Sequence, residues 1–427
     1  MIRVYLDWNV YSRIKTSNKD FYPELREILL GNDKFCFPFS TIHLTDIYES
    51  YVKVGWSNIQ GHLESLNLSK NLNIKQIFGQ EIAFYISEPI EELKSYILER
   101  NPDEKFGVNE ITNENDYIDY FPETTKFLKE QDEISEAQDK LISSFSNLIN
   151  SFLGENFKED YQKGMKISKG KLLAKKTNVI DYLNENSVKN GFTDFKSFND
   201  DLLLKINKNP KFIDEITTLF ATIDISGYGQ DNTTFSSTIT DSLHCAYAST
   251  CDIFIVDDVR TCLKSKEVYK VKNLIVKTFR PKEFIEYYKK HNLEFNSGKS
   301  ILDFAYNFPK LDEPIIKTET ENIYYLETYL FDFFNIISIN NLELEQPKIV
   351  KLCKLPAHNE LCLLTSEKED LLRKINSFFG EPKLIHDSWK ENGFLNSAWI
   401  YNEIELIKLE INYDEVNLSF IKCRKIE

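Results

Sequence analysis

The most constraining feature of this sequence is an alternation of apolar, strand-like runs and helix-like segments near its start. Residues 2–6 (IRVYL) form a short β-branched and aromatic run, and residues 34–39 (KFCFPF) form another. Between them, PELREILLG (23–31) has helical spacing and ends in glycine, which favours a helix end. Residues 41–54 then have roughly helical spacing. Such alternation predicts a parallel sheet joined by right-handed crossovers.

The same alternation returns in the second half of the chain. DIFIVDD (252–258) is an apolar run that ends in two acids, and a basic, helix-like stretch follows at 259–270. NLIVKTF (273–279) predicts another strand, and Pro281 lies where a helix is expected to begin. A helix over 240–250 is expected to open near Ser237 or Thr238. These elements extend the predicted parallel sheet.

The chain is too long for a single hydrophobic core, because it has 427 residues and one core stops growing at about 250–300. We predict an α/β domain over 1–294, with a parallel sheet flanked by helices and a long helical insertion at about 60–230. Helical spacing within the insertion is clearest between 122 and 154. Period-two alternation at 399–423 predicts antiparallel strands, so 295–427 is predicted to be a separate α+β domain of unknown role.

Acidic residues are predicted to gather at the sheet edge formed by the carboxyl ends of the strands, where ligands of such sheets bind. Asp7 ends the first strand, and Asp46 lies early in the helix after the second. Asp241 is expected to open the helix after the insertion, and Asp258, with Asp257 as a spare, ends the next strand. Taken singly, each acid is better explained as a helix-terminus or turn residue.

Four converging carboxylates indicate a cation site. Close carboxylates repel one another by a few kcal/mol per pair at an effective dielectric constant of ~20, so such a cluster requires cations. Oxygen ligands favour Mg²⁺ or Mn²⁺. Two such ions about 3.5–4 Å apart can activate a water and stabilise the leaving oxygen in phosphodiester cleavage.

In combination, these segments resemble the PIN-like family of metal-dependent nucleases. The resemblance covers about 1–60 and 235–290. It rests on four motifs and a closing strand that leads into Pro-x-Glu-Phe: Asp7-Trp8-Asn9-Val10, FSTIHLTDI with Ser40 and Asp46, DSLHCAYA from Asp241, IFIVDDVR with Asp258, and RPKEF at 280–284.

The resemblance implies a PIN-like fold and a Mg²⁺- or Mn²⁺-dependent endonuclease that hydrolyses phosphodiester bonds, in RNA rather than DNA. Asp7, Asp46, Asp241 and Asp258 would hold the metals, and Asn9 and Ser40 would support them. Three departures stand against the family pattern. Trp8 replaces a small residue, and about 195 residues separate the second and third acids. Val256 replaces a hydroxyl, so either the metal site has one ligand fewer or Asp257 substitutes for it.

Two histidines and one glutamate accompany these acids. His43 lies three residues before Asp46, and His244 lies three residues after Asp241. This spacing places each pair on one helix face, where the imidazoles could orient carboxylates, contact phosphate or transfer protons. Burial in the helix interface is the competing interpretation for both. Glu49 is a reserve ligand, with exposure to solvent as its alternative.

The net charge of −15 does not exclude a nucleic-acid substrate, because the negative charge is unevenly distributed. Segment 81–140 has 17 acids and 6 bases (−11), and the tail 295–427 has 22 acids and 15 bases (−7), so the rest nets +3 (−15 + 11 + 7). A lysine block could bind a phosphate backbone or could be a solvated helix face. It comprises Lys163, Lys166, Lys169, Lys171, Lys175 and Lys176.

A cytoplasmic protein is expected. The cysteines number seven and lack the paired spacing of a zinc site or disulfide framework, so buried thiols in a reducing compartment are predicted. The sequence has no secretion signal and no apolar stretch of 18 residues, so no membrane segment is expected. By analogy with other uses of the fold, the nuclease would be a toxin or defence effector controlled by its C-terminal domain.

Alternative functions stay open at this stage. The main one is a catalytically silent PIN-like scaffold that binds nucleic acid or a protein partner. A phosphatase of the haloacid-dehalogenase type also begins with a strand-terminal Asp, but its chemistry needs a second Asp where this chain has Asn9. A regulatory protein partner and a homo-oligomer are both compatible with the nuclease function.

Overall fold

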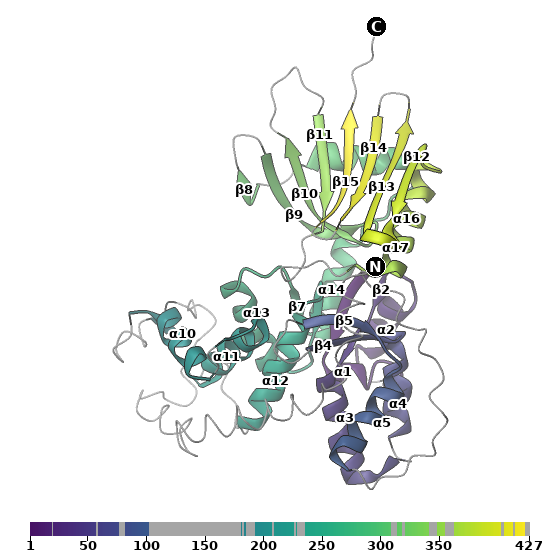
Figure 1. The fold of residues 1–427 in the computed structure, drawn as a ribbon. Helices are drawn as coiled ribbons and strands as arrows, with labels where there is room; N and C mark the ends of the chain where they lie inside the picture. Colours follow the sequence, from purple (N-terminus) through teal and green to yellow (C-terminus); the bar gives the residue numbers. More distant parts are fainter. Residues whose placement is uncertain are drawn as a thin grey trace.

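The structure is a computed structural model (Figure 1). It describes residues 1–101 without 19, 57–58 and 77–81; residues 181, 183 and 184; and residues 193–422 without 207–208, 226–227, 229–234, 309–313, 318–320, 341–347, 355–362, 403–404 and 413–414. The helix predicted between 122 and 154, the lysine block at 163–176 and most of the acidic segment 81–140 lie outside these residues.

The N-terminal half is built on a parallel sheet of four short strands in the order β2-β1-β6-β7. These strands are β1 (Ile2–Leu6), β2 (Phe35–Cys36), β6 (Ile253–Ile255) and β7 (Lys277–Phe279). All three pairings are parallel. The sequence therefore predicted the parallel sheet correctly, including the return of the chain to it after residue 250.

Helices cover both faces of this sheet, which explains why its strands are apolar on both sides. Val4 and Ile253 pack with α2 (Tyr22–Leu30) and α14 (Pro281–His291) on one face. Tyr5 and Phe254 pack on the other face with α11 (Phe212–Ile225), α12 (Phe235–Ala248) and α13 (Val259–Val271). Four cysteines lie buried as free thiols, as predicted: Cys36, Cys245, Cys251 and Cys262.

The expected second strand is split between two sheets. Residues 35–36 pair with β1, whereas β3 (Phe39–Ser40) pairs with β4 (Leu72–Gln76). Pro38 lies between them, and a proline has no N–H to donate to a strand partner. Ser40 at the end of β3 leads directly into α3 (Thr41–Val54), which carries Asp46.

Two predictions about the middle of the chain are corrected. The segment expected to be a helical insertion contains β4 and β5 (Ile82–Ile86), an antiparallel pair, in addition to α4 (Gln60–Leu66), α5 (Pro89–Arg100), α10 (Phe195–Ile206) and α11. The β4 run LNIKQ has one β-branched residue and no aromatic one, so these strands depend on pairing with each other and with β3 more than on their own residues. In addition, α12 begins at Phe235, so Asp241 lies in its second turn and does not open it.

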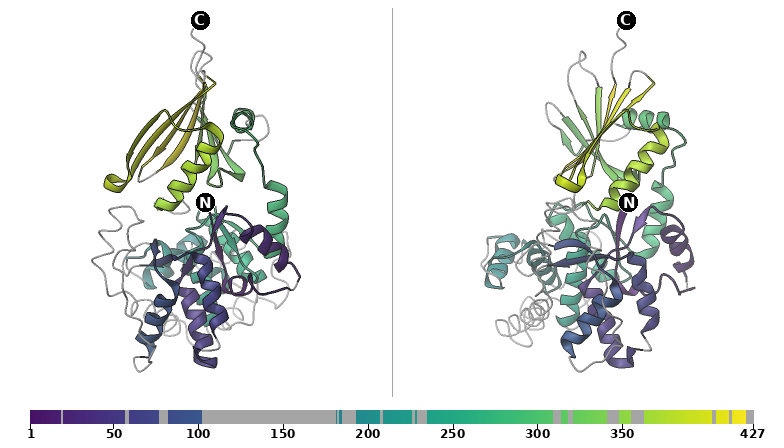
Figure 2. Two further views of the ribbon diagram at one scale, coloured as in Figure 1. Left: turned by 90° about the vertical axis from the view of Figure 1, so that its right-hand side faces the viewer. Right: turned by 45° about the vertical axis from the view of Figure 1, so that its right-hand side comes forward.

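The C-terminal part is an antiparallel sheet of eight strands packed on helices, which confirms the predicted antiparallel strands. Its order is β12-β13-β14-β15-β11-β10-β9-β8. Figure 2 shows that the sheet is strongly curved and that α15 (Gly298–Asn307) and α16 (Thr365–Phe379) cover one face. The strands are β8 (Ile316–Lys317), β9 (Glu321–Leu330), β10 (Phe334–Asn340), β11 (Lys348–Cys353), β12 (Leu384–Ser388), β13 (Phe394–Tyr401), β14 (Glu405–Ile411) and β15 (Val416–Lys422).

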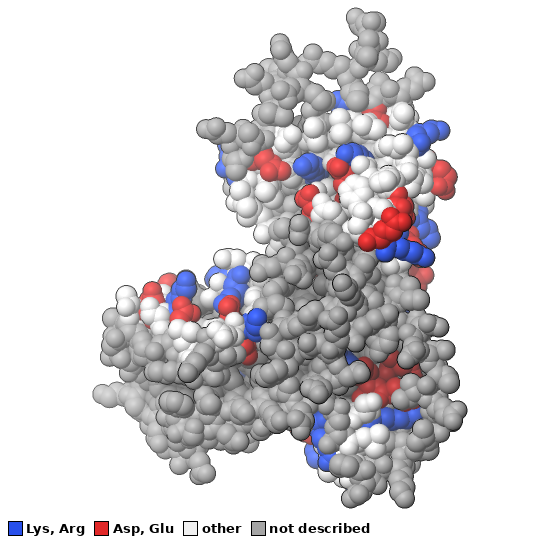
Figure 3. All heavy atoms as spheres, in the orientation of Figure 1, with Lys and Arg blue, Asp and Glu red and all other residues white. Residues whose placement is uncertain are grey.

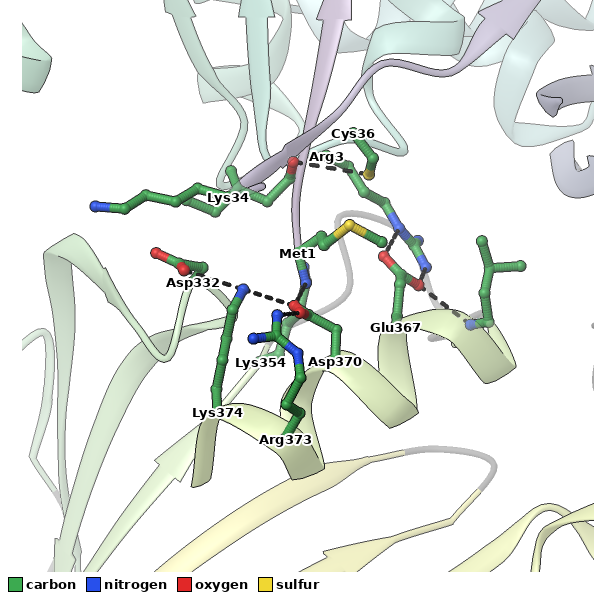
Figure 4. Close-up of polar contacts among 12 residues, drawn as sticks. Met1, Arg3, Lys34, Cys36, Asp332, Lys354, Glu367, Asp370, Arg373 and Lys374 are labelled. Carbon is green, nitrogen blue, oxygen red and sulfur yellow. Dashed lines mark hydrogen bonds and ion pairs between the residues drawn. The ribbon is translucent and has the colours of Figure 1, made fainter. Parts of the chain in front are cut away.

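Two buried ion pairs join this C-terminal sheet to the parallel sheet, and Figure 4 shows the one between Arg3 and Glu367. Arg3 on β1 donates from Nε to Oε1 of Glu367 on α16 over 2.9 Å. Lys354, just after β11, donates to Asp252, just before β6, over 2.8 Å. Both contacts lie at the amino ends of β1 and β6, so the carboxyl ends of these strands point away from the junction.

Candidate active site

Asp7 lies where β1 ends, at the edge of the sheet predicted to bind ligands. Its backbone N–H donates to the Ile255 carbonyl over 2.9 Å, so the ends of β1 and β6 are side by side. The carboxylate caps the short helix α1 (Trp8–Tyr11), and its Oδ1 accepts from the backbone N–H of Asn9 over 3.4 Å. Burial of the side chain raises the pKa of Asp7, and the charge of Asp46 raises it further.

Asp46 and His244 form a direct contact between two helices. Asp46 lies in the second turn of α3, and His244 projects from α12. Its Nε2 donates to Oδ2 of Asp46 over 3.1 Å. The side chain of Asp46 is 20% exposed and that of His244 only 4%. The sequence predicted that each histidine would accompany an acid of its own helix, whereas the contact joins residues 46 and 244 across helices.

Asp241 belongs to the same cluster. It lies about one turn before His244 on α12, and burial raises its pKa to about 7. Burial would lower the pKa of His244, but the hydrogen bond to Asp46 and the charges of Asp7 and Asp241 outweigh burial and raise it. His244 in turn lowers the pKa of both Asp7 and Asp241. The His244 imidazole therefore interacts electrostatically with all three carboxylates.

Behind His244, buried polar side chains continue the hydrogen bonding into the sheet. The Tyr5 hydroxyl lies 3.0 Å from Nδ1 of His244 and 2.7 Å from Oγ of Ser40. Nδ1 of His43 accepts from the backbone N–H of Ser40 over 3.0 Å, and its Nε2 lies 2.8 Å from the Leu6 carbonyl. Burial lowers the pKa of His43 well below its usual value, which favours the neutral ring. His43 is thus buried, as the competing interpretation expected.

The remaining predicted residues lie at the periphery. Asp258 is exposed and caps α13, since its Oδ1 accepts from the backbone N–H groups of Arg260 and Thr261 over 2.8 Å each. The half-buried Asp257 carboxylate lies 3.5 Å from Nη1 of Arg13. The side chains of Glu49 and Asn9 are exposed, and the backbone N–H of Asn9 donates to Asp7. The predicted lysine block, 163–176, falls outside the described residues.

The donor chemistry of the cluster suits a hard divalent cation. Asp7, Asp46 and Asp241 offer carboxylate oxygens, and two of them carry raised pKa values because ionised carboxylates are crowded and buried there. A cation would remove this cost. Within the part of the chain that the structure describes, no group of three or more His, Cys, Asp or Glu side chains forms a ready-made metal site.

Sequence reasoning missed several residues around the cluster. The sequence pattern identifies Tyr5 only as part of a strand, although its hydroxyl contacts both Ser40 and His244. Thr261 and Lys264 on α13 both lower the pKa of Asp241. No local pattern marks these residues, because they come together only through packing of α12 and α13 on the sheet. The sequence marks Trp8 only as a departure from the family pattern, whereas its ring lies 5.2 Å from that of His62.

Comparisons with known proteins add no identification. No protein-family model, no curated protein and no solved structure matches this chain. Among the helices of the described residues, none has the length and apolar character needed to cross a membrane.

Proposed function

We propose that this chain is a divalent-cation-dependent endonuclease of the PIN-like type that hydrolyses phosphodiester bonds in RNA. The observation that supports it is the grouping of Asp7, Asp46 and Asp241 around His244. The three acids come from segments far apart in the sequence, and all lie near the carboxyl ends of parallel strands, where ligands of such folds bind.

The residues have distinct tasks in this proposal. Asp7, Asp46 and Asp241, with Asp258 as a further ligand, would hold Mg²⁺ or Mn²⁺, which supplies an activated water and stabilises charge on the scissile phosphate. His244 orients the Asp46 carboxylate by holding its Oδ2, which leaves Oδ1 outside that bond. Asp7 is oriented by the Asn9 N–H. Burial of Asp7 and His244 keeps water away from these groups and strengthens their interactions.

Cleavage assays with labelled RNA and single-stranded DNA test the proposal. The full-length protein should cut RNA with Mn²⁺ or Mg²⁺ and lose activity with a chelator. Asp7→Asn should reduce cleavage by at least about 10²-fold, because it removes a charged ligand from the proposed centre. The exposed Asp33, changed to Asn, is a matched control that should retain full activity. Absence of cleavage by the folded wild-type protein with either metal would refute the nuclease function.

A catalytically silent scaffold is the second candidate, and the position of Asp258 favours it. This carboxylate is exposed and already occupied as a helix cap. Asp258→Asn retains a good capping side chain, so stability should stay within about 0.5 kcal/mol, whereas Asp258→Ala should lose about 1 kcal/mol in urea unfolding. If Asp258 is also a metal ligand, the Asn variant loses cleavage despite its unchanged stability. RNA binding without cleavage would support the scaffold.

We further propose that the C-terminal domain regulates the site or binds a partner protein. Its α16 and the residue after β11 contact the amino ends of the strands that lead to Asp7 and Asp258. Figure 3 shows both signs of charge interspersed on its visible sheet face. A mixed surface of this kind suits a protein partner better than a phosphate backbone. A homo-oligomer is one form that this partnership could take, and sedimentation of the purified protein tests it.

A further inference from the structure

The Tyr5 hydroxyl occupies a central place behind the carboxylate cluster. Tyr5 is fully buried on β1, two residues before Asp7, and its ring lies 4.9 Å from that of His43 and 5.9 Å from that of His244. Its oxygen contacts Ser40 Oγ at 2.7 Å and His244 Nδ1 at 3.0 Å. Removing a buried hydroxyl that has two hydrogen-bond partners lowers stability, because it leaves buried polar groups without their bonds.

The ends of this hydrogen-bond chain fix the orientation of both imidazoles. A carboxylate can only accept, so Nε2 of His244 carries the hydrogen that it shares with Asp46. At the other end, the Ser40 N–H donates to Nδ1 of His43, so Nε2 of His43 carries a hydrogen and donates it to the Leu6 carbonyl. The hydroxyls of Tyr5 and Ser40 lie between these fixed ends.

Both hydroxyls can donate and accept, so the Tyr5 hydroxyl finds a partner whichever hydrogen position His244 Nδ1 has. If Nδ1 carries a hydrogen, Tyr5 accepts it and donates to Ser40. If Nδ1 carries none, Tyr5 donates to it and accepts from the Ser40 hydroxyl, and Ser40 then holds Nδ1 of His43 through its backbone N–H alone. In both cases His244 keeps its Nε2–H directed at Asp46. A phenylalanine at position 5 would remove this adaptable partner.

We propose that Tyr5 is a positioning residue that couples two carboxylates of the site, a role that rests on the proposed nuclease function for its effect on catalysis. Through His244 it holds the Asp46 carboxylate. Through Ser40 and His43 it holds the Leu6 carbonyl, which belongs to the peptide that immediately precedes Asp7. The helix bearing Asp46 and the strand bearing Asp7 thereby share one buried hydrogen-bond chain.

The test compares Tyr5→Phe with Tyr269→Phe in the full chain. Tyr269 is a matched control because it is also fully buried, and its hydroxyl donates to the carbonyl of Cys245, the neighbour of His244 on α12. Tyr5→Phe should lower kcat for RNA by about 10–100-fold, the usual effect of losing a residue that orients a ligand, with little change in KM. Tyr269→Phe should leave kcat within about twofold.

A second readout needs no activity. Long-range ¹H–¹⁵N spectra of ¹⁵N-histidine protein report which ring nitrogens carry hydrogen. Wild type and Tyr269→Phe should show Nε2–H on His43 and His244, and Tyr5→Phe should shift the His244 signals. Ser40→Ala, which keeps Tyr5, should shift those of His43 and provides the same test if Tyr5→Phe does not fold.

The two proposals can fail separately. A wild-type protein that does not cleave RNA refutes the nuclease function, while the histidine spectra still test the hydrogen-bond chain. Spectra and kcat of Tyr5→Phe that match those of Tyr269→Phe would overturn the positioning role, as would histidine spectra of Ser40→Ala identical to wild type.

Discussion

At the scale of single residues, Asp241 gives the clearest pH-dependent prediction. Its pKa of about 7, raised by burial, exceeds the ordinary value near 4. Between these values the folded state holds a proton that the unfolded state has released, so this residue's contribution to stability falls as pH rises towards 7 and is then constant. Asp241→Asn removes this effect. The variant should therefore gain about 2–3 kcal/mol relative to wild type between pH 5 and pH 8.

Urea unfolding at the two pH values measures this gain. The exposed Asp33, changed to Asn, provides the control and should show the same difference from wild type at both. A gain in Asp241→Asn that does not depend on pH would contradict the raised pKa.

Added Mn²⁺ should raise the melting temperature of wild type more than that of Asp241→Asn, because an ion that binds only the folded state stabilises it.

The sequence predicted some site residues and not their partners. Asp7 could be placed because an apolar run ends directly before it, and strand ends in parallel sheets share an edge. The contact between Asp46 and His244 could not, because 198 residues separate them and the contact depends on how α3 and α12 pack. The role of Tyr5 could not be predicted for a similar reason. Nothing in the neighbouring sequence distinguishes a strand tyrosine whose buried hydroxyl makes hydrogen bonds from one whose ring only packs in the core.

At the scale of helices and strands, the elements with strong local patterns were predicted best. The predicted helix at 23–31 is α2, and the basic stretch at 259–270 is α13. Elements determined by tertiary pairing were predicted worst: the run 34–39 divides between two sheets at Pro38, and β4 and β5 lie in a segment expected to be helical. Short strands gain their stability from neighbours, so their own residues identify them weakly.

The close packing of α15 on α16 gives a prediction at this scale. A Cβ added to Gly298 would lie 2.5 Å from Cε1 and 2.8 Å from Cδ1 of Phe379, and 2.9 Å from the Phe378 carbonyl oxygen. Gly298→Ala should therefore destabilise the protein by about 1–3 kcal/mol, as overpacking does. Gly61 in α4 has no atom within 4 Å of such a Cβ, so Gly61→Ala should be neutral or stabilise by up to about 1 kcal/mol. Thermal unfolding of both variants checks the contrast, and equal effects would contradict it.

At the scale of the whole molecule, a buried ion pair joins the parallel sheet to the C-terminal antiparallel sheet and its helices. Arg3 and Glu367 have side chains only 5% and 0% exposed, and two hydrogen bonds of 2.9 and 2.5 Å connect them. Burial would raise the pKa of Glu367, but the charge and hydrogen bonds of Arg3 outweigh it and lower it to about 2. The pair therefore stabilises the fold above pH 4–5 and ceases to do so as pH falls towards 2.

Removing one partner of the Arg3–Glu367 pair should lower the free energy of unfolding more than the loss of the pair itself does. Arg3→Met leaves a buried carboxylate without its cation, and Glu367→Gln leaves a buried guanidinium without its anion, so each should lose about 3–5 kcal/mol in urea unfolding. In the double variant neither charge is left unpaired, so its loss of unfolding free energy should be well below the sum of the two single losses.

Because Arg3 lies on the strand that ends at Asp7, each single variant should also lower RNA cleavage if the C-terminal domain controls the site. Additive losses of stability in the double variant would show that Arg3 and Glu367 act independently, and unchanged cleavage in the single variants would separate the junction from the candidate active site.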